Sequence, residues 1–166
     1  MHVRAQLPAD VDAVRELNRA AFEGPDEARI VDALRGADMP LVSLVAETDG
    51  TVVGHILFSP VTLATASLPL VMGLAPMAVL PGHQRSGIGT ALVRAGLDAC
   101  RTLGAVAVVV LGHPAYYRRF GFVRASRFGL TCEYDVPDDV FMALELQDGA
   151  LSGHAGVVRY HREFAG

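Results

Sequence analysis

Lysine is absent from this chain of 166 residues, so all 14 of its Lys and Arg positions are arginine. A P-loop places a lysine on the nucleotide phosphates, and pyridoxal enzymes and Schiff-base aldolases use a lysine amine as nucleophile. The sequence therefore excludes these mechanisms. Any phosphate group must be held mainly by backbone amides at a helix N-terminus, with arginine assisting.

Cysteine is also scarce, and positive charge does not dominate. Cys100 and Cys132 are too few for a disulfide framework and lack metal or redox spacing, so we expect packing residues and a cytoplasmic protein. The polar start at Met1–Arg4 does not resemble a signal peptide. A net charge of −4 argues against broad nucleic-acid binding. No His, Asp and Glu group has metal-ligand spacing, so no metal is expected.

Charged residues are missing from Gly50 to Gln84. A membrane-spanning helix needs about 20 apolar residues in one continuous helix. Here Pro60, Pro69, Pro76 and Pro81 interrupt the run. Short apolar segments separated by proline and glycine are typical of buried strands, so the pattern predicts a sheet core and no membrane span.

Length and periodicity predict one α/β domain over residues 1–166. Asp49-Gly50 favours a type I′ hairpin turn, and residues 63–70 are either a loop or the continuation of a bent strand. We expect helices over 10–22, 25–36, 87–103 and 115–120, and strands over 2–5, 42–47, 52–58, 71–80 and 105–111, near 122, and over 140–147 and 157–161.

The most informative segment is the loop between the strand at 71–80 and the helix that follows. Pro76 predicts a bulge or a separation from a neighbouring strand, because proline cannot donate to the ladder. Gly87 and Gly89 stand at the helix N-terminus, where unpaired amides and the helix dipole favour a phosphate group. Leu92 occupies the position of the third glycine in a dinucleotide-binding fingerprint, so that reading is excluded.

Residues 84–89, Gln-Arg-Ser-Gly-Ile-Gly, resemble the Q/R-x-x-G-x-G/A signature of the GNAT superfamily of N-acetyltransferases. The resemblance implies a mixed, mostly antiparallel central sheet with one right-handed parallel β-α-β crossover and helices on both faces. It also implies that the loop amides hold the pyrophosphate of acetyl-CoA while the preceding strand pairs with pantetheine. The implied cofactor contacts are Met77, Ala78, Val79, Gln84, Arg85, Ser86, Gly87, Ile88, Gly89 and Thr90.

A second segment, ending in Gly121-Phe122, resembles the Y-x-x-x-G-F element of the same superfamily. The resemblance implies that Tyr117 lies near the thioester and protonates the departing thiolate, although Tyr116 could replace it by a shift of one residue. Many members carry an asparagine about seven residues before the tyrosine. Here Gly112-His113-Pro114 precedes it, which resembles a bacterial subgroup of small predicted acetyltransferases.

Direct transfer needs a neutral amine, and a free alkylamine has a pKa near ~10.4, so a general base is expected. Glu27 is the first candidate, with Glu47, His55 and His83 as alternatives; His83 more readily lines the phosphate loop. Arginine could assist in holding the phosphates, and the candidates are Arg85, Arg118 and Arg119.

The sequence thus predicts transfer of acetyl from acetyl-CoA to a primary amine by sequential attack, since neither cysteine is placed for a covalent intermediate. The alternative is a CoA-binding sensor or interaction module without transfer. The acceptor, whether a small molecule, a peptide N-terminus or a lysine side chain, is expected between the first helices, residues 63–70 and the late strands. The high apolar content also suggests a homodimer.

Overall fold

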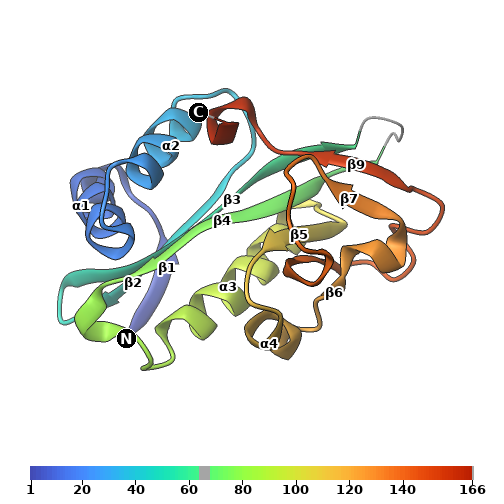
Figure 1. The fold of residues 1–166 in the computed structure, drawn as a ribbon. Coiled ribbons are helices and arrows are strands. Elements are labelled where there is room, and N and C mark those ends of the chain that lie inside the picture. The colour runs from blue at the N-terminus through green and yellow to red at the C-terminus, as the bar shows by residue number, and fades with distance from the viewer. Residues whose placement is uncertain (64–67, 166) are drawn as a thin grey trace.

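In the computed structural model, which describes residues 1–63 and 68–165, nine described strands form a twisted sheet with helices on both faces (Figure 1). The strands are β1 (His2–Ala5), β2 (Val42–Thr48), β3 (Thr51–Leu63), β4 (Val71–Val79), β5 (Ala107–Leu111), β6 (Val123–Arg124), β7 (Leu130–Cys132), β8 (Phe141–Glu145) and β9 (Gly156–Arg159). Their order is β1-β2-β3-β4-β5-β8-β6, and β9 pairs with both β3 and β7. The pairs are antiparallel except for β4–β5 and the short β7–β9 pair. The predicted mixed sheet with a β-α-β crossover is therefore confirmed.

The longer helices divide between the two faces of the sheet. Helices α1 (Val11–Phe22) and α2 (Asp26–Arg35) cover one face, and α3 (Ile88–Leu103) covers the other (Figure 1). The short helix α4 (Pro114–Tyr117) follows β5, and a 3₁₀ turn at Arg162–Ala165 ends the described chain beside α2. No helix of the described residues is long and apolar enough to cross a membrane.

Local sequence signals placed most elements correctly. Asp49 and Gly50 have positive φ values of 51° and 77°, as a type I′ turn requires. The expected strand at 52–58 is longer, because β3 continues through Pro60 to Leu63; residues 64–67 of the undecided segment lie outside the described residues. The expected helix at 115–120 is α4 followed by a 3₁₀ turn. Strand β7 was not predicted.

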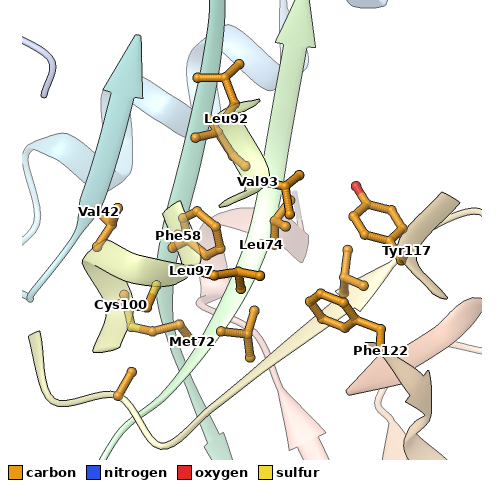
Figure 2. Close-up of a cluster of buried hydrophobic side chains, with 14 of the residues drawn as sticks. Val42, Phe58, Met72, Leu74, Leu92, Val93, Leu97, Cys100, Tyr117 and Phe122 are labelled. Atoms are coloured by element: carbon orange, nitrogen blue, oxygen red, sulfur yellow. The ribbon is translucent and has the colours of Figure 1, made fainter. Parts of the chain in front are cut away.

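Helix α3 packs unusually close to β3 through glycine. A Cβ on Gly54 of β3 would lie 2.8 Å from an Ile88 side-chain carbon, and a Cβ on Gly96 of α3 would overlap the Phe58 ring. Figure 2 shows Phe58 beside Leu97 and Cys100 in this core. Burial raises the pKa of the Cys100 thiol to about 12, so this residue is a protonated packing group, as expected.

The most consequential irregularity lies in β4 at Pro76. The β3–β4 register shifts from Ile56↔Met77 to Phe58↔Leu74, so β4 carries one extra residue there. The β4–β5 ladder ends at Leu74↔Val110, after which β4 continues beside β3 and β5 continues beside β8. The predicted bulge and strand separation at Pro76 are therefore confirmed.

Candidate active site

A cavity of about 880 Å³ opens where β4 and β5 separate. One part of its wall is the glycine loop and the first turn of α3, and another is the end of β5 with α4. The remaining part comes from α1, α2 and the 3₁₀ turn at the C-terminus. Its lining residues are Phe22, Glu27, Ile30, Leu74, Ala75, Pro76, Met77, Val79, His83, Gln84, Arg85, Gly87, Ile88, Gly89, Thr90, Leu111, Gly112, His113, Tyr116, Tyr117, Arg119 and Phe164.

The glycine loop and the first turn of α3 line this cavity. Gly87 precedes α3 with a φ of 87°, a left-handed conformation that glycine adopts without strain. The first hydrogen bond of the helix runs from the Ala91 amide to the Gly87 carbonyl, at 3.1 Å. The backbone amides of residues 88–90 therefore have no acceptor within the helix. The side-chain amide nitrogen of Gln84 donates to the Val79 carbonyl at 3.1 Å, which fixes the loop to the end of β4. Backbone amides without a helical acceptor, together with the helix dipole, favour an anion at this end of the cavity.

Gly89 leaves the space that this site needs. A Cβ there would lie 2.9 Å from the Tyr116 hydroxyl and 3.6 Å from the Met77 methyl carbon. The Arg119 guanidinium carbon lies 4.4 Å from the centroid of the Tyr116 ring, which places a cation at the same end of the cavity. Arg85 also lines the cavity, whereas Arg118 does not.

Tyr117 occupies the opposite side of the strand separation. Its ring packs on Gly112, where a Cβ would overlap it, and lies edge-to-face with Phe122 at 5.7 Å between centroids. The hydroxyl points away from Phe122 and has no hydrogen-bond partner among the described residues (Figure 2). Burial raises the pKa of Tyr117 to about 12, so the phenol stays protonated at neutral pH.

The two adjacent tyrosines therefore have different surroundings. Their rings are nearly perpendicular, at 85° with centroids 5.1 Å apart. The Tyr116 hydroxyl lies against Gly89 at the phosphate loop, while Tyr117 packs on Gly112 at the end of β5. Of the two, Tyr117 is thus the one beside the strand separation.

Two of the four base candidates lie at the cavity and two lie elsewhere. Glu27 lines the cavity and is half-buried, and no ion pair or hydrogen bond engages its carboxylate in the described part of the chain. His83 lines it near the loop. Glu47 is 2.8 Å from Arg4 in an ion pair on β2 and does not line the cavity. His55 is fully buried on β3, outside the cavity, because the alternation of β3 points it between the sheet and α1.

Eight of the ten expected cofactor contacts line the cavity; Ala78 and Ser86 do not. Ala78 is buried opposite His55 in the β3–β4 ladder. The Ser86 hydroxyl donates to the His83 carbonyl and holds the loop internally. Within residues 1–63 and 68–165 no group of three His, Cys, Asp or Glu side chains could hold a metal ion.

Sequence reasoning missed several lining residues far from the motifs. Phe22, Ile30 and Phe164 come from α1, α2 and the C-terminal 3₁₀ turn. An apolar residue at a helix end or in a terminal turn carries no local signal of a binding site. Only the fold brings these positions together.

Comparison with known proteins identifies the family that shares this sequence and this fold. The model of the acetyltransferase (GNAT) family matches residues 11–122. An Escherichia coli K12 protein, the uncharacterized N-acetyltransferase YhbS, is 39% identical over 165 residues, 99% of this chain and 98% of its own. The crystal structure of E. coli YhbS in complex with CoA has a TM-score of 0.93 at 37% identity, covering 99% of this chain and 92% of that one.

A GNAT acetyltransferase from Brucella melitensis, solved with acetyl-CoA, has a TM-score of 0.81 at 40% identity and covers 98% of this chain and 97% of that one. An aminoglycoside 6′-N-acetyltransferase shares the fold at 17% identity, with a TM-score of 0.66. The family model, the close relatives and the cavity at the β4–β5 separation agree, and the chain belongs to the GNAT family of acetyltransferases.

Proposed function

We propose that this protein transfers the acetyl group of acetyl-CoA to a primary amine by direct attack. The observation that carries the proposal is one cavity lined by the glycine loop, by Tyr117 and by the carboxylate of Glu27, which has no ion-pair partner in residues 1–63 and 68–165. One enzyme domain over residues 1–166, working in the cytoplasm, is the simplest organisation that accommodates this site. A homodimer remains a prediction of the apolar composition.

The cavity suits acetyl-CoA, which supplies the acetyl thioester. The amides of residues 88–90 and the cations of Arg85 and Arg119 suit its phosphates. The part of β4 at Met77–Val79 has no β5 partner, so its backbone can pair with the amides of pantetheine as with an added strand. The bulge at Pro76 leaves the end of β5 open to the cavity, and we expect the thioester to bind there.

Tyr117 donates the proton that the leaving sulfur needs. As the amine nitrogen forms the new C–N bond, the C–S bond breaks, and its electron pair takes the Tyr117 proton. The raised pKa keeps the phenol protonated before the step. The resulting phenolate recovers a proton from solvent or from the acceptor's surplus proton. A positioned acid of this kind contributes roughly 10²–10⁴-fold to the rate.

Glu27 receives the proton that the attacking amine must lose, directly or through one water. It is the only carboxylate that lines the cavity within the described residues. It lies in the first turn of α2, at the end of the helix that borders the cavity. A carboxylate without a competing cation also attracts an ammonium group into the site, which favours an amine acceptor.

The test of this function is steady-state release of CoA thiol across a panel of primary amines, with wild type, Tyr117→Phe and Tyr116→Phe as matched variants. We expect Tyr117→Phe to lower kcat by about 10²-fold or more while the Kd for CoA is unchanged. Tyr116→Phe should retain kcat. Unchanged turnover in Tyr117→Phe refutes the acid role. Tight acetyl-CoA binding without transfer to any amine favours the sensor.

A further inference from the structure

The acceptor side of the cavity is apolar, although the cofactor side is cationic. Phe22, Ile30 and Phe164 form this wall, which we call the acceptor wall. Ile30 lies three residues after Glu27 on α2, so both occupy one side of the helix. Among the described residues, Glu27 is thus the one carboxylate that shares the cavity with this apolar wall.

The wall residues are fixed by different parts of the fold. Phe164 belongs to a 3₁₀ turn that contacts α2, where Arg29 and Glu163 approach to 3.6 Å. Its ring lies edge-to-face with Tyr160, 5.7 Å between centroids, and Tyr160 packs on Gly73 of β4. The C-terminal turn is therefore anchored to the sheet and presents Phe164 to the cavity.

Phe22, the last residue of α1, is an exposed member of the wall. It is 39% exposed, and Leu111, on the opposite side of the cavity, is 36% exposed. Large apolar side chains with this much exposure are few among the described residues, and these two line the same cavity. Apolar groups left open at a cavity are covered when an apolar ligand binds.

We propose that the acceptor is a small primary amine with one positive charge and an apolar body, aromatic or aliphatic. The inference rests on the proposed function, because it assigns the acceptor of that same site. The ammonium group lies at Glu27 before it loses its proton, and the apolar body packs on Phe22, Ile30 and Phe164.

The charges of the cavity exclude two other acceptor classes. A polyamine or an aminoglycoside would bring a second ammonium group against the acceptor wall, where no other carboxylate of the described residues lines the cavity. A free amino acid would bring a carboxylate, which would need a cation as its partner. The arginines that line the cavity belong to the phosphate end, since Arg85 is in the loop and Arg119 stacks on Tyr116.

The experiment compares three amines of different chemistry: 2-phenylethylamine, ethanolamine and spermidine. CoA release should give a kcat/KM for 2-phenylethylamine at least about tenfold above the other two. Phe164→Ala and Phe22→Ala should each raise the KM for 2-phenylethylamine by roughly tenfold and leave the KM for acetyl-CoA unchanged. Leu103→Ala, which truncates an exposed apolar residue outside the cavity, is the matched control and should change neither.

Calorimetric titration of 2-phenylethylamine into the CoA-bound protein separates this inference from the proposed function. If 2-phenylethylamine binds, if Phe22→Ala weakens this binding and if no amine is acetylated, the transferase is refuted while the acceptor wall stands as a binding site for an apolar amine. Phe22 is exposed, so this variant tests the wall without disturbing the core. The inference is overturned if 2-phenylethylamine does not bind, if spermidine or ethanolamine is used equally well, or if neither phenylalanine variant changes its KM.

Discussion

Acid should destabilise this protein through His55, a base candidate that the structure places in the core. The ring lies between two partners: Nε2 is 2.9 Å from the Ser43 hydroxyl, and Nδ1 is 3.3 Å from the Asn18 amide nitrogen. Ser43 donates its hydroxyl proton to the side-chain amide oxygen (Oε1) of Gln6, so the same hydroxyl accepts from Nε2–H. Nδ1 is then left to accept from the Asn18 amide. Only the neutral imidazole satisfies both partners.

The size of the effect follows from the two protonation equilibria. Burial lowers the pKa of His55 from 6.5 to about 3, with the nearby Arg35 acting in the same direction. The unfolded chain therefore takes up a proton near pH 6.5 that the folded protein refuses. The contribution of neutral His55 to stability is fully present above pH 6.5 and is lost progressively as the pH falls toward 3. Between pH 7.5 and pH 5 this linkage removes about 2 kcal/mol from the free energy of unfolding.

Carboxyl groups contribute little in that window. Ion pairs and hydrogen bonds with Arg4 lower the pKa of Asp10, and hydrogen bonds from Arg15 and Arg35 outweigh burial and lower that of Asp32. Their stabilising contributions are present above the unfolded pKa and are lost mainly below about pH 4. The interval from pH 7.5 to pH 5 therefore isolates His55 from these groups.

Urea unfolding followed by far-UV circular dichroism at pH 7.5, 6.5, 5.5 and 5 measures this slope. We expect wild type to lose about 2 kcal/mol over the interval. His55→Gln should be less stable at pH 7.5 but should lose most of this dependence. His154→Gln, which removes a histidine whose ring makes no hydrogen bond among the described residues, should keep the wild-type slope. An unchanged slope in His55→Gln would refute the reasoning.

Other substitutions separate chemistry from folding. Because the pKa of Tyr117 is raised to about 12, kcat should show no alkaline decline up to pH 10 in a pH–rate profile; a decline centred below pH 10 would contradict its role as the buried acid. Gly112→Ala pushes the Tyr117 ring from its place, so kcat should fall at least tenfold with CoA affinity retained, as measured by calorimetry. Gly96→Ala instead collides with Phe58 in the core and should cost about 1–3 kcal/mol in thermal unfolding, with kcat retained. The buried thiol of Cys100, with its pKa raised to about 12, should resist iodoacetamide at pH 8 in the native protein, and mass spectrometry after acetyl-CoA should find no acetylated cysteine.

Features set by a few neighbouring residues could be predicted from the sequence. A type I′ turn requires positive φ at both central positions, and Asp49 and Gly50 tolerate it, so this hairpin turn follows from the two residue types. Pro76 cannot complete a ladder, so a bulge in β4 follows in the same way. The glycine loop combines strand, turn and helix signals within one short segment, which is why its wall of the cavity could be anticipated.

Features that depend on distant partners could not be predicted. Strand β7 has three residues, too few for a recognisable alternation, and it exists because it pairs with β9. Residue type alone does not decide among the four candidate bases, Glu27, Glu47, His55 and His83. Their positions in the fold do. Glu47 forms an ion pair with Arg4, and His55 faces α1. Glu27 lines the cavity and has no ion-pair partner in the part of the chain that the structure describes. A residue type gives the chemistry that is available, and long-range packing decides where it is available.

The extra residue in β4 gives this distribution its functional meaning. A regular β4 would stay paired with β5 beyond Leu74, and the ladder would close the space that the cavity occupies. With the bulge, β4 follows β3 and β5 follows β8, so the glycine loop and Tyr117 face each other across a gap between strands. Restoring regular pairing would remove the backbone groups offered to the cofactor and the space beside Tyr117 together. The proposed cofactor binding and the proposed acid role of Tyr117 therefore depend on one local irregularity of the sheet.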